Sequence, residues 1–177
     1  MNPEIIAIFG IYFGFALIEA FRTGLFRKPN QTRDDAIVEI VSTVATLGIT
    51  QPFVVAMSAV ALGVLLPQYA GALTGINYFA GFLLFLIFDD FVNYLYHRAA
   101  HSNAWLYGLH RAHHSGEYMG VRVLFRNNVF YYLLAPHLWA SGTLIYLGLG
   151  WVYASYLVIR VTVSIASHSD VCWDRPL

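Results

Sequence analysis

The stretch Asp89–Ser115, DDFVNYLYHRAAHSNAWLYGLHRAHHS, holds five of the seven histidines of this 177-residue chain and directly follows a long apolar run. The five form two closely spaced groups: His97, His101, His110, His113 and His114. On a helix, side chains four residues apart share a face and lie about 6 Å apart along the axis. Two imidazoles at this spacing can reach one metal ion, or one each of two neighbouring ions. The stretch therefore predicts a metal site on helices.

Polar residues precede the first histidine on the same helical stripe. Asn93 lies four residues before His97, and Asp90 lies three residues before Asn93. Unpaired polar groups are costly in an apolar medium, so a polar line on an apolar helix needs partners. We expect Asp90 and Asn93 to orient the metal-binding histidines through hydrogen bonds. Zinc is satisfied by three or four ligands, whereas a larger all-nitrogen set suits iron, so the spacing alone leaves the metal open.

The composition is that of a membrane protein. Apolar residues make up 58% of the chain and charged residues only 11%, against about 25% charged in a soluble domain. The net charge of zero gives no indication of a nucleic-acid partner. Cys172 is the only cysteine, which excludes a disulfide within the chain. The first apolar segment lacks a basic leader and a cleavage site, so we interpret it as a retained span.

Five apolar segments predict an all-α, polytopic transmembrane helical bundle forming a single membrane domain over residues 1–177. We expect spans at about 5–21, 36–66, 77–96, 129–147 and 151–166, with a histidine-rich helical segment on the cytoplasmic side. The second segment contains Pro52, which removes a backbone hydrogen bond and clashes with the preceding turn. It is either one helix kinked at Pro52 or a hairpin that returns to its own side.

The distribution of basic residues favours the kinked helix. Residues 22–35 and 98–126 together carry eight of the ten basic side chains. A single crossing between them places both segments on the same side, and the positive-inside rule makes that side cytoplasmic. A hairpin would separate the two basic segments across the membrane.

Three ionisable residues lie inside apolar runs. His137 follows Pro136 and is a functional candidate by its position, but it could equally bond a backbone carbonyl freed by the proline, so it is left out of the site. Glu39 and Arg160 are expected to lie near helix ends and to extend toward the membrane interface.

The combined pattern Asp90-Phe-x-x-Tyr-x-x-His97-Arg98-x-x-His101, then Leu106-x-x-x-His110-Arg111-x-His113-His114-Ser115, resembles the fatty acid hydroxylase/sterol desaturase superfamily. The resemblance runs from about Phe82 to the C-terminus, and His168-Ser169-Asp170 is similar to a family element that follows the last transmembrane hairpin. Members of this family are integral membrane di-iron enzymes. They use O₂ and electrons from a redox partner to hydroxylate or desaturate lipids.

The resemblance implies an iron centre whose ligands include six histidines: His97, His101, His110, His113, His114 and His168. It also implies a lipid substrate taken from the bilayer (sterol, fatty acyl or alkylglycerol type) and an electron donor of cytochrome or ferredoxin type. The membrane would be the bacterial inner membrane or the endoplasmic reticulum. The family pattern continues to a third histidine box, so we expect the chain to be C-terminally truncated and its ligand set to be incomplete.

Two other functions are compatible with the same residues. One is an inactive or truncated membrane relic that retains a metal site, since a fold does not guarantee its chemistry. The other is a bis-histidine haem protein for electron transfer. That function predicts histidines paired across separate helices at membrane depth, whereas five of these histidines lie in two tight groups.

Overall fold

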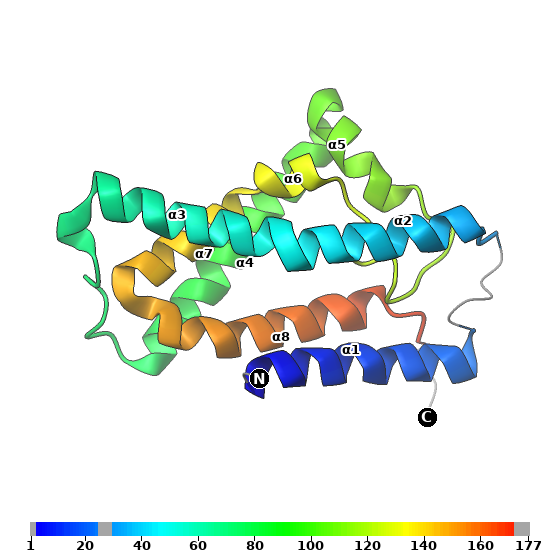
Figure 1. Ribbon diagram of the computed structural model, residues 1–177, viewed down its shortest axis with the longest axis horizontal. Helices are drawn as coiled ribbons and strands as arrows, with labels where there is room; N and C mark the ends of the chain where they lie inside the picture. The colour runs from blue at the N-terminus through cyan, green and yellow to red at the C-terminus, as the bar shows by residue number, and fades with distance from the viewer. Residues whose placement is uncertain (1–2, 25–29, 172–177) are drawn as a thin grey trace.

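The computed structural model describes residues 3–24 and 30–171 and confirms the predicted all-α class (Figure 1). Helix makes up 79% of the protein, and the described residues contain no strand. The α-helices in chain order are α1 Pro3–Arg22, α2 Arg33–Thr43, α3 Gln51–Leu65, α4 Tyr78–Ser102, α5 Ala104–His114, α6 Val129–Leu133, α7 Pro136–Leu144 and α8 Gly150–His168. Two π-helical segments, η1 Val44–Thr50 and η3 Ile145–Leu149, and a short 3-10 helix, η2 Pro67–Tyr69, complete the set.

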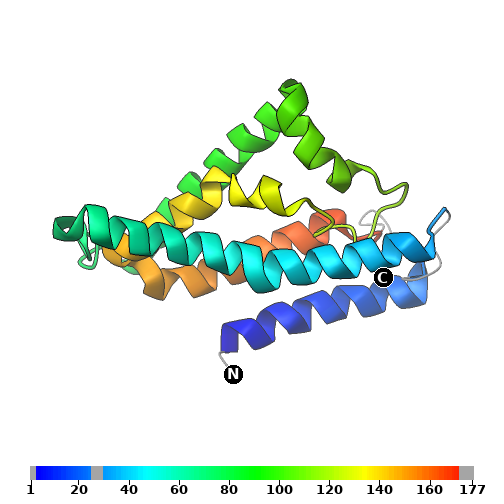
Figure 2. The same ribbon diagram turned by 45° about the horizontal axis from the view of Figure 1, so that its top comes forward.

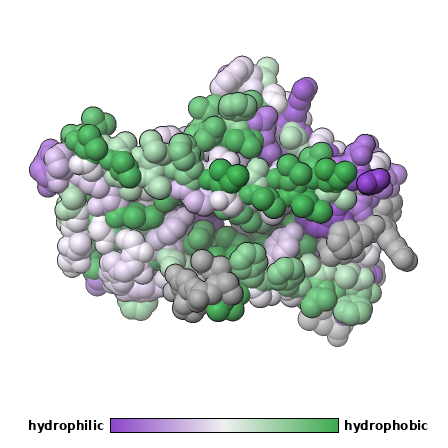
Figure 3. Space-filling view, viewed as in Figure 1, coloured by the Kyte–Doolittle hydropathy of each residue, from purple (hydrophilic) through white to green (hydrophobic). Residues whose placement is uncertain are grey.

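Three helical runs are long and apolar enough to cross a membrane: Arg33–Leu65, Tyr78–Ser102 and Pro136–His168, among the described residues. Many of their large apolar side chains are exposed, including Phe79 at 82% and Val64 at 75%. Figure 3 shows this apolar surface over α2 and α3. Such exposure is unfavourable in water and favourable against lipid, so the protein is a membrane protein.

The run Arg33–Leu65 does not reverse direction at Pro52 (Figure 1). The disturbance precedes the proline, because η1 is π-helical and Pro52 is the second residue of α3. A proline ring clashes with the carbonyl group four residues earlier in a regular helix. The wider turn of η1 accommodates Pro52 where the sequence predicted a kink.

The region 129–147, predicted as one span, is interrupted at Pro136. It contains two helices, α6 and α7, because Pro136 starts a new helix at a position where its missing N–H costs nothing. Gly148 then has φ +104°, and an added Cβ would meet Thr74 Cγ2 at 2.5 Å. The chain turns back at this glycine, so α8 runs along α1 (Figure 1).

The connection between α5 and α6 contains a long buried stretch. Every residue from 120 to 127 is buried, and Val121 and Phe125 pack with Ala16 of α1 and Ile165 of α8. Glu19 holds this loop through its Oε1 atom, which accepts the Val121 N–H at 2.9 Å and the Asp170 N–H at 2.8 Å. A single buried carboxylate therefore joins α1, the loop and the end of α8.

Glu39 and Arg160 do not extend to the interface as expected. Glu39 is 1% exposed and lies 2.5 Å from Arg122 Nη2. Arg160 Nε lies 2.7 Å from Asp89 Oδ2, in a pair that links α8 to α4. Burial in the bundle makes a paired partner necessary, since an isolated buried charge is costly. The expectation was wrong because sequence position does not reveal a partner on another helix.

Candidate metal centre

The sharp turn between α4 and α5 brings the two histidine groups together. Asn103 ends α4 and begins α5, and its side-chain oxygen accepts the N–H groups of Trp105 at 3.0 Å and Leu106 at 3.1 Å. This N-cap satisfies backbone donors that a new helix leaves free. Figure 2 shows the two helices meeting in a V. The last turns of α4, which extends to Ser102, therefore face α5.

Four imidazoles converge between these helices. His97 and His101 of α4 and His110 and His114 of α5 each offer a nitrogen, and these nitrogens all lie within 4.8 Å of one another. The Nε2 atoms are 3.1 Å apart in the His97–His101 pair and 3.0 Å apart in the His110–His114 pair. The spacing of four residues thus places each pair on one helical face.

A second pair of nitrogens comes from α5 and α8. Nε2 of His113 lies 3.3 Å from Nε2 of His168. The ring of His113 is also 5.2 Å from the ring of His114 and 5.4 Å from that of His110, measured between centroids. All six histidines predicted from the sequence are therefore brought into one continuous cluster. The assignment of each as a metal ligand stays a prediction.

Neighbouring groups hold the second pair in place. The carbonyl oxygen of Ser164 lies 2.9 Å from His168 Nδ1 and accepts a hydrogen bond from it, so Nε2 is the ring nitrogen that faces His113. Asn127 Nδ2 lies 3.4 Å from His113 Nδ1 on the other side of that ring. Ser164 and Asn127 thus orient the two rings.

The three histidines of α5 are neutral at physiological pH. Burial, followed by the neighbouring imidazoles, lowers the pKa of His110 to about 3 and that of His113 to about 4. Burial also lowers the pKa of His114. A charged imidazolium is disfavoured where it loses water and faces other cations. The neutral form is the one that binds a metal ion.

These residues fit a metal centre. Four imidazole nitrogens converge at one point, and His113 and His168 present a second pair whose Nε2 atoms face each other. All-imidazole sets suit zinc, copper, iron or nickel. The fit rests on the geometry and chemistry of the donors.

Asn93 and Asp90, the two polar residues expected to orient the histidines, differ in their burial. Asn93 is half-buried and lines a cavity together with His97. Asp90 is exposed, and within the described part of the chain it makes no hydrogen bond to a histidine. The carboxylate that faces inward is its neighbour Asp89, 1% exposed. Strict spacing by four residues from His97 through Asn93 leads to Asp89, so the signal was present in the sequence.

The cavity beside the histidines has a volume of about 260 Å³. Its lining includes four of the six clustered histidines: His97, His110, His113 and His168. His137 and Arg160 line it as well, so His137, which was left out of the site, belongs to its surroundings. Within residues 3–24 and 30–171, neither ring nitrogen of His137 has a hydrogen-bond partner, so the expected bond to a backbone carbonyl freed by Pro136 is not formed there.

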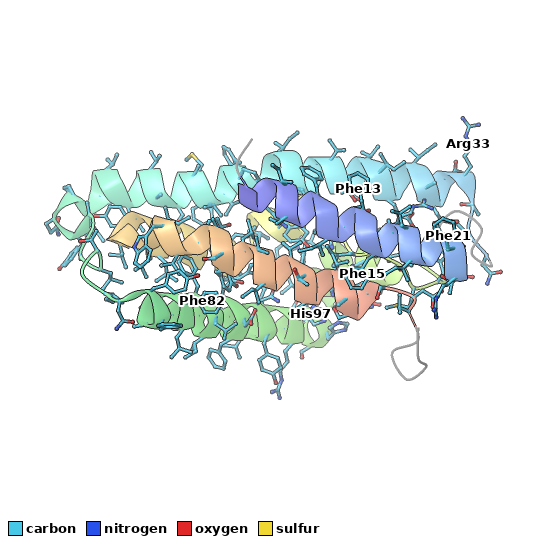
Figure 4. The ribbon with its side chains drawn as sticks, turned by 90° about the horizontal axis from the view of Figure 1, so that it is seen from below. Phe13, Phe15, Phe21, Arg33, Phe82 and His97 are labelled. Atoms are coloured by element: carbon cyan, nitrogen blue, oxygen red, sulfur yellow. The ribbon has the colours of Figure 1, made fainter. Side chains whose placement is uncertain are left out.

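An apolar groove of about 620 Å³ adjoins this cavity. It is bounded by α1, by the η1–α3 junction and by α8, and its lining is almost entirely apolar. Four residues line both spaces: Leu47, Gln51, Phe125 and Val161. Figure 4 shows His97 near the end of α4 and Phe13 on α1, which lines the groove. The groove therefore connects the lipid-facing helices with the histidine cluster.

The fold and the site together define an all-helical membrane protein with a histidine cluster of metal-binding geometry beside an apolar groove. Residues 82–177 match the family model described as fatty acid hydroxylase, which covers more than half of the chain. The chain belongs to the fatty acid hydroxylase family. Searches of curated proteins and of solved structures find no match. The matched segment contains all six clustered histidines and His137.

Proposed function

We propose that this protein is a membrane-bound di-iron oxygenase that hydroxylates or desaturates a lipid. The reaction takes O₂ and electrons from a donor protein of cytochrome or ferredoxin type. Family membership supports an oxidoreductase acting on lipid. The observation that carries the proposal is the six-imidazole cluster next to an apolar groove, because a redox metal and a hydrocarbon chain are the two things such an enzyme must bring together.

The six imidazoles divide between two ions in this proposal. His97, His101, His110 and His114 would hold one iron, and His113 and His168 would contribute to the second. When bound, iron supplies the activation of O₂ that oxidises an unactivated C–H bond. In hydroxylation one oxygen atom of O₂ enters the product and the other leaves as water, whereas in desaturation both leave as water. Either reaction consumes two electrons from the donor protein and two protons from solvent.

The remaining tasks belong to the protein's own residues. The groove holds the hydrocarbon chain, and the shared residues Leu47 and Val161 guide it into the cavity. The buried loop 120–127 and the aromatic wall of Phe125 and Tyr131 exclude water from the reacting carbon. Ser164 and Asn127 keep the rings of His168 and His113 in position.

We further propose that the histidine cluster lies at the cytoplasmic face of the bacterial inner membrane or the endoplasmic reticulum. Arg98 and Arg111 support this orientation, because both are exposed next to the cluster. Arg122 and Arg126 carry less weight than expected from the sequence. Both are buried in ion pairs, with Glu39 and Asp35 respectively.

The test uses the purified protein in lipid nanodiscs, loaded with iron and supplied with a chemical reductant and ¹⁸O₂. Mass spectrometry of the lipids is expected to show either a hydroxyl group that carries ¹⁸O or a new carbon–carbon double bond. The His114→Ala variant serves as the matched inactive protein. The proposal is refuted if the iron-loaded protein oxidises none of the lipids in a total membrane extract. One bound zinc without oxygenase activity points to a relic, and a Soret absorption band points to a haem protein.

A further inference from the structure

His137 is a buried side chain whose two ring nitrogens meet no partner in the part of the chain that the structure describes. It is 2% exposed, and Nδ1 and Nε2 both lack a hydrogen-bond partner among the described residues. A buried polar group without a partner is unfavourable, so such a group calls for an explanation. His137 lines the same cavity as His97, His113 and His168. The cavity is therefore where a partner for this ring can sit.

Arg160 lines the cavity too, from α8. Its Nε atom lies 2.7 Å from Asp89 Oδ2, while Ser141 Oγ donates to Asp89 Oδ1 at 2.8 Å. Since Nε is taken by Asp89, the Nη groups of the guanidinium are the donors that Arg160 can offer to the cavity. Arg160 and His137 thus contribute donors from two helices to one small space.

The charges on the side of the cavity formed by His137 and Arg160 favour an uncharged ligand. Asp89 already neutralises Arg160, and Ser141 supports the carboxylate of the pair. The carboxylate of a ligand that entered beside Asp89 and Arg160 would be a second buried negative charge with no cation of its own to pair with, which is costly. A hydroxyl or carbonyl oxygen accepts an N–H without that cost.

We propose that His137 and Arg160 bind an uncharged oxygen function, a hydroxyl group or an ester or amide carbonyl, at the polar end of a single-chain lipid. The hydrocarbon part of that lipid lies in the adjoining groove, which shares Leu47, Gln51, Phe125 and Val161 with the cavity. The inference rests on the proposed function, because it assigns the polar end of that reaction's substrate. It is independent of the metal and can be tested by binding alone.

The experiment measures displacement of a fluorescent long-chain alcohol from metal-free protein in nanodiscs. The competitors are 1-hexadecanol, methyl hexadecanoate, hexadecanoate and hexadecane. His137→Leu is expected to weaken binding of the alcohol and the ester about tenfold, the effect of one lost hydrogen bond to a buried group, and to leave hexadecane nearly unchanged. His137→Gln keeps a donor and an acceptor and is expected to bind all four as the natural protein does.

Arg160→Lys is a second variant, so that the proposal can still be tested if His137→Leu does not fold. It keeps the charge opposite Asp89 but removes the guanidinium donors, so the same selective loss is expected. Equal weakening of alcohol and alkane shows a packing role and overturns the proposal, as does unchanged binding. Tighter binding of hexadecanoate than of its methyl ester overturns the choice of an uncharged ligand. If ¹⁸O enters lipid in natural protein and in His137→Leu alike, only this inference fails. If the alcohol binds selectively but no lipid is oxidised, only the proposed function fails.

Discussion

Nε2 of His168 lies 3.3 Å from Nε2 of His113, although 55 residues separate the two in the chain. One ring comes from α8 and the other from α5, so their approach depends on how these helices pack. The Ser164 carbonyl on α8 and Asn127 in the buried loop orient the rings from either side. The second half of the cluster therefore exists only when the loop 120–127 and α8 are correctly seated.

The first prediction concerns metal loading. His114→Ala removes one of four convergent nitrogens and is expected to abolish iron loading, as is His113→Ala, whose ring bridges the two halves of the cluster. Metal content per chain is measured by mass spectrometry, alongside circular dichroism to confirm helicity. His137→Leu is the matched control and is expected to keep the full content, because His137 is not among the convergent nitrogens. Full iron content in both His113→Ala and His114→Ala would refute the metal site.

The second prediction separates two adjacent carboxylates. Asp89→Ala leaves Arg160 buried without its partner and is expected to destabilise the protein by about 3–5 kcal/mol. Asp90→Ala removes an exposed side chain and is expected to change stability by less than about 0.5 kcal/mol. Unfolding in detergent micelles, followed by circular dichroism, measures the difference. Equal effects of the two substitutions would contradict the inward orientation of Asp89.

The third prediction tests the carboxylate of Glu19. Glu19→Ala leaves the N–H groups of Val121 and Asp170 without their acceptor, at a cost of about 2–4 kcal/mol. Because the same carboxylate seats the loop and the end of α8, metal bound by His113 and His168 is expected to decrease as well. Thermal unfolding and metal content are measured together. Glu117→Ala, at an exposed position, is the control, and a Glu19→Ala protein that matches it would show that this link is dispensable.

The fourth prediction concerns the crossing of α3 and α7. A Cβ added at Gly142 would lie 2.6 Å from Ser58 Cβ, closer than real contacts allow, while one added at Gly63 of α3 meets nothing within 4 Å. Gly142→Ala is therefore expected to destabilise the protein by about 1–3 kcal/mol through overpacking. Gly63→Ala is expected to be neutral or slightly stabilising, because alanine favours helix. Thermal unfolding of the two variants decides, and similar melting temperatures would rule out the close crossing.

Several features of the fold were predictable from local sequence. Long apolar runs between polar connections predicted helices, because an apolar membrane requires each segment to satisfy its own backbone hydrogen bonds. The spacing of His97 and His101, and of His110 and His114, predicted rings on a common face, because the helical repeat is the same in every sequence.

Other features could not be predicted from spacing. Spacing by four residues from His97 leads to Asp89, but only the position of Arg160 on α8 shows the partner that this carboxylate meets. Glu39 and Arg160 were expected at the interface because their partners lie 83 and 71 residues away, as Arg122 and Asp89. The burial of the loop 120–127 was missed for the same reason, since four arginines between residues 98 and 126 resemble an exposed basic loop.

The sequence by itself determined the helical class and the membrane setting, because composition and helical periodicity are local properties. The family resemblance implied which six histidines are candidates for a metal. Only the tertiary structure decided that His168 joins His113, that His137 and Arg160 face the cavity, and that the groove leads to it. These relationships arise where helices distant in sequence pack together. Burial then makes each polar side chain depend on the partner that another helix supplies.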